Sequence, residues 1–181
     1  MTRRANKRGP LGPQSLEEAA ITYVARYATT EAKLVGYLRR KLRERGWEGE
    51  REPQVEAIAA RMVEAGYIDD LSFAKARSGG LLRRGYGARR IGQALFQAGV
   101  DEAVSEEVAP AEAERREAAL VLARRRGFGP FGREPVDEKR REKQIAAMLR
   151  AGHAFPDALA MIDARDEAGA EQWVAEAEDE Q

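Results

Sequence analysis

Apolar residues in the first third of the chain recur every three or four positions, which is the spacing of one face of an α-helix. Three segments show this pattern, 15–27, 29–46 and 53–66, and we predict one helix in each. The apolar positions are Leu16, Ala19, Ala20, Tyr23, Val24, Tyr27, then Leu34, Leu38, Leu42, then Val55, Ile58, Ala59, Met62. No strand-like alternation extends beyond a few residues, so we predict an all-α protein.

Residues with known preferences for helix ends mark the limits of these segments. Ser15 and Glu18 have the spacing of a capping box, in which each side chain accepts a hydrogen bond from a free backbone N–H at the helix start. Thr29 or Thr30 is expected to cap the second helix, and Gly46 to end it with a left-handed backbone. The proline at position 53 is expected in the first turn of the third helix.

A second group of three helical segments is expected between residues 68 and 109. One member of the Asp69-Asp70 pair is expected to cap its first helix. That helix contains Ser78-Gly79-Gly80, where we expect a bend or fraying, since each glycine costs about 1 kcal/mol relative to alanine. The second helix of the group buries Ile91 and Leu95.

A third group follows from residue 110 to residue 163, with a loop rich in glycine and proline after its first helix. A glycine ends the middle helix of each group, at Gly46, Gly99 and Gly152, in equal steps of 53 residues. A fixed period indicates one supersecondary unit stacked on its neighbours. We therefore predict three tandem three-helix repeats, over 15–67, 68–109 and 110–163, that form an elongated, curved array.

The two ends of the chain differ from the rest in composition. Residues 1–14 carry four cations among glycines and prolines and are predicted to be a disordered basic arm. Residues 164–181 form an acidic tail, in which Ala170, Trp173, Val174 and Ala177 allow a short helix. We expect residues 1–14 to be mobile and the last dozen residues to be dispensable for folding, because neither segment has enough apolar surface to offset the entropy lost on ordering.

Charge and composition narrow the kinds of function that are open to this chain. Lysine plus arginine and aspartate plus glutamate both number 31, so any surface for a charged partner must be local. The chain has no cysteine, which excludes disulfides and thiolate metal sites and fits a reducing compartment. No apolar run approaches the length of a membrane span. We expect a cytoplasmic protein, monomeric, without a cofactor and without a membrane contact.

One stretch of sequence, Gly66 to Val100, resembles a known protein family. It reads as a turn, the double acid Asp69-Asp70, a helix, the turn Gly85-Tyr86-Gly87, and a second helix that starts with Arg89-Arg90-Ile91. This order resembles the central segment of the RecX family, small helical regulators of the RecA recombinase. The spacing Leu38-x-x-x-Leu42-x-x-x-Gly46 and the segments Tyr23-Val24-Ala25-Arg26-Tyr27 and Leu149-Arg150-Ala151-Gly152 are also similar to this family.

The resemblance implies a function as well as a fold. It implies three-helix repeats that bind along the groove of the RecA–DNA filament and inhibit the ATPase and strand exchange of RecA. On this basis we expect a regulator of DNA repair, homologous recombination and the SOS response, and no enzyme activity.

Three features could instead indicate catalysis, and each has a simpler interpretation. The Asp69-Asp70 pair could perform acid–base chemistry, but a helix cap is favoured because no nucleophile or metal ligand lies nearby in sequence. His153, the single histidine, is expected to be a solvated loop residue rather than a base. Gly85-Tyr86-Gly87 lacks the spacing and the lysine of a phosphate-binding loop and is expected to be a turn between helices.

Clusters of basic residues are the main candidates for partner binding. They are Arg39-Arg40-Lys41-Arg43, Arg83-Arg84 with Arg89-Arg90, Arg124-Arg125-Arg126, and Lys139-Arg140-Arg141-Lys143. The second cluster is favoured, because Arg89 lies about 200° round the helix from the buried Ile91. Arg89 also lies at a helix start, where the helix dipole disfavours a cation. The last three clusters are predicted to contact carboxylates of RecA or DNA phosphates.

A second hypothesis remains open, in which the chain is a direct DNA-binding protein. Tandem helix-turn-helix-like units would then contact single- or double-stranded DNA without RecA. A steep loss of affinity with salt in the absence of RecA would distinguish this hypothesis from the first.

Overall fold

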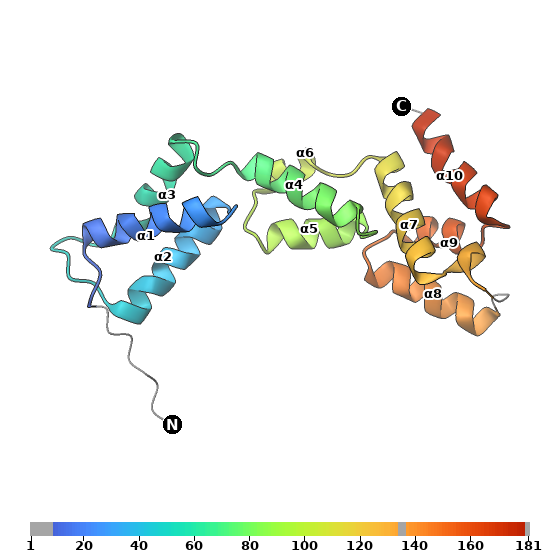
Figure 1. Ribbon diagram of the computed structural model, residues 1–181, viewed down its shortest axis with the longest axis horizontal. Helices are drawn as coiled ribbons and strands as arrows, with labels where there is room; N and C mark the ends of the chain where they lie inside the picture. The colour runs from blue at the N-terminus through green and yellow to red at the C-terminus, as the bar shows by residue number, and fades with distance from the viewer. Residues whose placement is uncertain (1–8, 134–136, 180–181) are drawn as a thin grey trace, which may run out of the picture. The chain divides into compact units, whose positions relative to one another are not determined.

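The protein's structure is a computed structural model that describes residues 9–133 and 137–179. Over these residues the chain is all-helical, as predicted (Figure 1). The elements are α1 (Pro13–Arg26), α2 (Glu31–Arg45), α3 (Val55–Glu64), α4 (Asp70–Leu82), α5 (Ala88–Phe96), α6 (Glu102–Glu107), α7 (Glu112–Arg126), the short 3₁₀ helix η1 (Gly129–Phe131), α8 (Glu138–Arg150), α9 (Phe155–Ile162) and α10 (Glu167–Asp179). Within the described ranges, the one β-bridge joins Leu11 and Trp47.

Helix α1 begins earlier than the sequence pattern predicts. Its N-cap is Gly12, and Pro13 occupies the first helical position, where the missing N–H of proline costs nothing. Ser15 lies inside the first turn, and its hydroxyl accepts a hydrogen bond from the Gly12 N–H at 2.9 Å. The predicted capping box between Ser15 and Glu18 is therefore wrong.

The predicted disordered arm is also wrong for residues 9–14. Leu11 is fully buried in the core of α1–α3. Its N–H donates to the carbonyl of Gly46 and its carbonyl accepts from the N–H of Glu48, both at 3.0 Å. A single leucine, held at both backbone groups, thus anchors this segment beside the end of α2. Residues 1–8 of the predicted arm lie outside the described residues.

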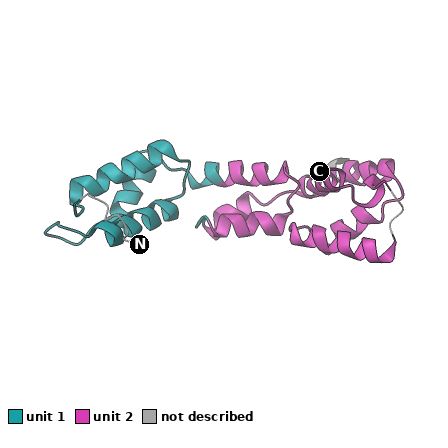
Figure 2. Ribbon diagram, turned by 60° about the horizontal axis from the view of Figure 1, so that its bottom comes forward, with its two compact units in different colours: residues 1–73, 98–100 teal, residues 74–97, 101–181 magenta. Residues whose placement is uncertain are grey.

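The chain divides into two compact units, which Figure 2 shows in separate colours. The first unit comprises residues 1–73 and 98–100, and the second comprises residues 74–97 and 101–181. The division falls within α4, not at a predicted repeat boundary, and the segment Ala98–Val100 belongs to the first unit. The boundaries of the three repeats stay a prediction.

The core of the first unit is formed by α1, α2 and α3. Its buried side chains are Leu11, Leu16, Ala20, Leu34, Leu38, Val55, Ile58, Ala59, Met62 and Ile68. Leu38 is fully buried, as predicted from the helical spacing, whereas Leu42 is only partly buried and packs against this core. Helix α3 has Gln54 as its N-cap, so the proline at position 53 precedes the helix instead of opening it.

A buried threonine joins the start of α2 to the segment Ala98–Val100. Thr30 is the N-cap of α2, as predicted, and its hydroxyl accepts from the N–H of Lys33 at 3.2 Å. The same hydroxyl donates to the carbonyl of Ala98. The next residue, Gly99, has a φ of 70°, and a Cβ there would lie 2.4 Å from the Cβ of Ala32. Both the backbone angle and the close approach therefore require glycine at this position.

In the second unit, the expected fraying of α4 at Ser78-Gly79-Gly80 does not occur. The helix runs uninterrupted to Leu82. Ser78 is buried, and its hydroxyl donates to the carbonyl of Val108 at 3.4 Å. On the exposed side, Arg84 donates from Nε to the carbonyl of Gly80 at 2.9 Å. Contacts on both sides of the helix thus hold the glycine-containing turn.

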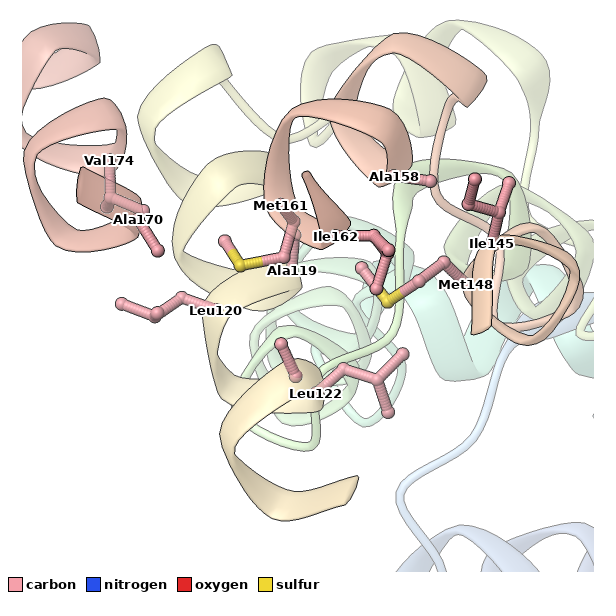
Figure 3. Packing of buried hydrophobic residues seen from close by; sticks show 11 residues of the cluster. Ala119, Leu120, Leu122, Ile145, Met148, Ala158, Met161, Ile162, Ala170 and Val174 are labelled. Atoms are coloured by element: carbon pink, nitrogen blue, oxygen red, sulfur yellow. The ribbon is translucent and has the colours of Figure 1, made fainter. Parts of the chain in front are cut away.

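The core of the second unit lies among α7, α8, α9 and α10 (Figure 3). Its buried side chains are Ala119, Leu120, Leu122, Ala123, Ile145, Met148, Ala158, Met161, Ile162, Ala170 and Val174. The fully buried Met148 and Met161 are unbranched at Cβ, and such side chains fill irregular gaps between helices well. In α5, Ile91 and Leu95 are buried, as predicted.

Helix α10 corrects the description of residues 164–181 as an unpacked acidic tail. Ala170, Val174 and Ala177 are buried. The guanidinium of Arg116 in α7 lies 4.8 Å from the ring centre of Trp173 and donates to the Trp173 carbonyl at 2.6 Å. The tail therefore does have a packed apolar face, and the reason for expecting it to be dispensable is wrong.

No helix within the described residues is long and apolar enough to cross a membrane.

Candidate charged interface

The turn Gly85-Tyr86-Gly87 is fixed by contacts with the turn between α8 and α9. The N–H of Gly87 donates to the carbonyl of Ala151 at 3.0 Å, and the N–H of Arg89 donates to the carbonyl of Gly152 at 3.1 Å. A Cβ at Gly85 would lie 2.8 Å from the backbone nitrogen of Leu122, so only glycine fits there. The segment is a turn between helices, as expected, and it also packs against the turn between α8 and α9 inside the second unit.

His153 is part of this contact, and the expectation of a solvated loop histidine is wrong. Only 3% of the residue is exposed. Its Nε2 lies 3.0 Å from the carbonyl oxygen of Gly85, and because a carbonyl can only accept, Nε2 carries the proton. Its Nδ1 is buried without a hydrogen-bond partner among the described residues. Burial lowers the pKa of His153, while the Gly85 hydrogen bond and the charge of Asp157 oppose this shift.

The Asp69-Asp70 pair forms helix caps. Asp69 accepts from the N–H of Ser72 at 2.8 Å and from its hydroxyl at 2.6 Å, which places Asp69 at the start of α4. Asp70 accepts from the N–H of Glu31 at 3.1 Å, in the first turn of α2. Burial raises the pKa of Asp70, the Glu31 hydrogen bond lowers it, and the charge of Asp69 raises it. The two carboxylates thus accept hydrogen bonds from backbone N–H groups at helix starts, and the cap interpretation is confirmed.

The second basic cluster, Arg83, Arg84, Arg89 and Arg90, is exposed as the helical phase predicts. Its members do not share one role. Arg89 donates from Nη2 to the carbonyl of Leu149, in the last turn of α8, where a cation is favoured by the helix dipole. Arg89 therefore helps to join α5 to α8, a role that its position in the sequence does not reveal.

A tyrosine lies among the remaining arginines of this cluster. The guanidinium carbons of Arg84 and Arg90 lie 6.0 Å and 5.8 Å from the centre of the Tyr86 ring. Within the described part of the chain, no carboxylate forms an ion pair with Arg83, Arg84 or Arg90. We call Arg83, Arg84, Tyr86 and Arg90 the arginine–tyrosine face.

The first basic cluster is mostly engaged inside the first unit. Arg39 pairs with Glu56, and both Arg40 and Lys41 lie within 4 Å of Glu44. The pKa of Glu56 is lowered, mainly by the backbone hydrogen bond of that residue and next by the hydrogen bond from Arg39. This cluster is mostly a set of local surface ion pairs.

In each of the third and fourth basic clusters, one arginine forms an ion pair with a carboxylate of the same unit. Arg124 pairs with Glu171 of α10, and its guanidinium lies 5.5 Å from the ring centre of Phe131. Arg141 donates two hydrogen bonds of 2.6 Å to Asp163. These bonds raise the pKa of Arg141 and lower that of Asp163. Both arginines therefore join helices instead of facing a partner.

The rest of these two clusters lies near a single surface hollow. Arg126, Arg140 and Lys143 line a hollow of about 320 Å³, together with Arg133. Arg125 and Lys139 are exposed beside it in the sequence. Arg133 is an isolated cation in the loop rich in glycine and proline, and it was not among the predicted residues because no spacing signal in the sequence connects it to the others.

The described residues contain no candidate metal site. Groups of three or more histidine, aspartate or glutamate side chains close enough to hold a metal ion do not occur in residues 9–133 and 137–179. The fold and the surface define a class of protein. It is an all-helical protein whose most distinctive surface feature is a set of exposed arginines that form no ion pair with the described carboxylates.

Comparison with known proteins assigns the family. The family description "RecX, second three-helix domain" matches residues 69–108. The chain is 34% identical to the regulatory protein RecX of Myxococcus xanthus over 174 residues, which cover 88% of this chain and 93% of that one. It is also 34% identical to the Thermus thermophilus protein of the same name, over 78% and 87% of the two chains. The chain belongs to the RecX family, and the resemblance seen in the sequence is confirmed.

A solved structure supports the fold independently. The crystal structure of RecX from Lactobacillus salivarius superposes with a TM-score of 0.64. The match covers 90% of this chain and 96% of that chain, at 15% sequence identity. At this identity the agreement is evidence for the helical fold, while the assignment to the family comes from the sequence relatives.

Proposed function

We propose that this protein is a non-enzymatic regulator that binds the RecA–DNA filament and inhibits the ATPase and recombinase activity of RecA. In this role it would act in the cytoplasm, as a monomer, during DNA repair by homologous recombination and in the SOS response. Family membership supports this proposal, because the relatives are named regulatory proteins.

The observation that carries the proposal is the arginine–tyrosine face. Arg83, Arg84 and Arg90 are exposed, Arg84 and Arg90 lie about one aromatic ring, and no described carboxylate forms an ion pair with any of the three. In the chain as a whole, acidic and basic residues are equal in number, so nearby carboxylates are common. A surface that lacks them is suited to carboxylates or phosphates supplied by a partner. Arginine and tyrosine are also enriched where protein interfaces bind most strongly.

The test is reversal of these charges. A variant with Arg83→Glu, Arg84→Glu and Arg90→Glu should bind preformed RecA–DNA filaments roughly tenfold or more weakly, because attraction to an acidic surface becomes repulsion. Co-sedimentation at two salt concentrations measures binding, and the DNA-dependent ATPase of RecA measures inhibition. Wild-type binding should weaken with salt, since exposed charges are screened.

The matched control reverses three other exposed arginines, Arg26, Arg43 and Arg77, and changes the net charge by the same amount. This control should bind nearly as the wild type does. Circular dichroism should show unchanged helix content in both variants. If the first variant binds and inhibits as the wild type does, the arginine–tyrosine face is only a solvated surface and the proposal is wrong.

A further inference from the structure

A hollow of about 430 Å³ lies at the turn between α8 and α9, wholly within the second unit. Its volume is in the usual range of ligand pockets, which is roughly 300–1,000 Å³. The apolar part of its lining comes from Ala88, Leu149, Ala154 and Phe155. The polar part includes the buried His153, and we call this site the His153 hollow.

The two turns that carry this lining are held against each other through their backbones. The N–H of Arg89 donates to the carbonyl of Gly152 at 3.1 Å. A Cβ at Gly152 would lie 2.5 Å from the backbone nitrogen of Arg90, and a Cβ at Gly87 would lie 2.4 Å from the carbonyl carbon of Gly152. The hollow is therefore organised before any ligand arrives, which lowers the entropic cost of binding.

His153 offers the hollow a hydrogen-bond acceptor that no described residue uses. Its Nε2 is occupied by the carbonyl of Gly85, which is not part of the lining. Its Nδ1 has no partner among residues 9–133 and 137–179. Burial lowers the pKa of His153, so the ring is neutral near neutral pH and Nδ1 keeps its lone pair. A buried acceptor without a partner is destabilising, and an N–H of a ligand would remove this cost.

Two arginines of the lining supply donors for a carboxylate. Arg89 donates from Nη2 to the carbonyl of Leu149. Arg115 donates from Nη1 to the carbonyl of Pro110 at 3.3 Å, and its Nε lies 4.0 Å from Oδ2 of Asp157. Each guanidinium has five N–H donors, so both arginines keep donors for a ligand. Asp157 is the one acid among the described lining residues, so the lining has one net positive charge, which matches a single carboxylate.

The start of α9 adds to this positive potential. Its N-cap, Ala154, has no side-chain oxygen that could accept from the free N–H groups of the first turn. The positive end of a helix dipole favours a carboxylate, and these N–H groups can donate to it. The next residue, Phe155, is 56% exposed and gives an apolar surface beside the same helix start.

The last residue of a peptide chain has all the groups that match this lining. Its amide N–H, its carboxylate and its side chain are joined to one Cα. An internal aspartate or glutamate uses its side chain as the carboxylate and has none left for the apolar part of the lining. Capture of a C-terminal carboxylate is also a recurring mode of peptide recognition.

We propose that the His153 hollow binds the C-terminal residue of a peptide chain of a protein partner, with an aliphatic side chain at that residue. The carboxylate binds Arg89 and Arg115, and the amide N–H donates to Nδ1 of His153. The side chain packs against Leu149 and Phe155. This inference goes beyond the proposed function, because it requires neither RecA nor DNA and uses no residue of the arginine–tyrosine face.

The experiment titrates the full chain, labelled with nitrogen-15, with the N-acetylated peptide Ser-Ser-Ser-Leu and follows the protein resonances by NMR. The largest amide shifts should occur at the turn between α8 and α9. The same peptide with a C-terminal amide in place of the carboxylate should bind roughly tenfold or more weakly, since a hydrogen bond to a charged group is lost. An analogue whose last amide is replaced by an ester lacks the N–H. It should bind roughly threefold or more weakly and should not shift the Nδ1 resonance of His153.

Variants of the lining test the same contacts from the protein side. Arg115→Gln should weaken binding of the free acid roughly tenfold, and Arg115→Lys should recover part of this loss. The matched control, Arg150→Gln, removes the same charge from an exposed position outside the lining and should bind as the wild type does. Ala154→Tyr fills the hollow from an exposed position and should abolish binding. Circular dichroism shows whether each variant keeps its fold, and the peptide analogues test the inference on the wild-type chain in any case.

Several results would contradict the inference. It is wrong if the free acid does not bind, or if the amidated peptide binds equally well. It is also wrong if an amidated peptide with an internal aspartate binds as tightly as the free acid, because the hollow would then recognise any carboxylate. Shifts that lie away from the turn between α8 and α9 would place the peptide elsewhere. The filament assay with Arg83, Arg84 and Arg90 reversed tests the proposed function separately.

Discussion

At the scale of single residues, the structure separates local roles from roles that depend on distant neighbours. Thr30, Gly46 and Asp69 act on the helix ends beside them. The sequence predicted Gly46 directly and limited each of the two caps to a pair of neighbouring residues. Arg89 and His153 were interpreted wrongly or incompletely, because their partners Leu149 and Gly85 lie more than 50 residues away in the sequence. A side chain whose partner is remote leaves no spacing signal.

His153 leads to a prediction about pH. Its folded pKa is lowered from 6.5 by burial, whereas in the unfolded chain it titrates near the ordinary value. As the pH falls below about 6.5, the unfolded chain binds a proton that the folded protein does not, so the stability should decrease. The thermal midpoint should therefore fall between about pH 7.5 and about pH 5.5.

The variant His153→Gln provides the comparison for this prediction. Glutamine keeps a donor for the carbonyl of Gly85 but does not titrate, so its midpoint should fall less over the same interval. Aspartate and glutamate contribute mainly at lower pH, which leaves this interval to the histidine. An equal fall in both proteins would show that His153 does not control this pH dependence.

At the scale of secondary-structure elements, the apolar spacing identified α2, α3 and α5 well, since each has one buried face. Helix α10 shows the limit of this approach. Its acidic residues suggested a solvated tail, yet Ala170 and Val174 complete the core formed by α7 and α9 (Figure 3). Small side chains carry little hydrophobicity of their own, and their contribution becomes visible only once a partner helix lies against them.

Removal of α10 tests this conclusion. A chain ending at Ala164 should lose about 3 kcal/mol or more of unfolding free energy, because burial of Val174, Ala170 and Trp173 is lost and Leu120 becomes exposed. Chemical denaturation of both proteins measures the difference. The variant Glu171→Gln is the control. It removes only the exposed pair with Arg124, which is worth about 0–1 kcal/mol. Equal stability of the truncated and full chains would support the original expectation of a dispensable tail.

At the scale of the whole molecule, the two units have separate cores of buried side chains. Repeat proteins of this kind are stabilised mainly by contacts within each unit and with its neighbours. A loss of packing in one core should therefore affect the helices of that unit first.

The fully buried Leu38 and Met148 allow a symmetrical test of this prediction. Each change to alanine should cost about 2–5 kcal/mol. Hydrogen exchange should become faster mainly in α1–α3 for Leu38→Ala and mainly in α7–α10 for Met148→Ala. If each variant accelerates exchange equally in both units, the molecule unfolds as a single cooperative structure and the prediction is wrong.

The sequence by itself determined the helical class, most helix limits, the core positions Leu38, Ile91 and Leu95, and the family resemblance. These features follow from the spacing of residues that are close in the sequence, because a helix places residues three or four positions apart on the same face. Only the tertiary structure decided that Arg124 and Arg141 are neutralised, that Arg89 joins α5 to α8, and that Arg126 and Arg133 meet Lys143 in one hollow. The physical reason is that the electrostatic role of a charge depends on which other charges lie within a few ångströms, and this is set by how the helices pack.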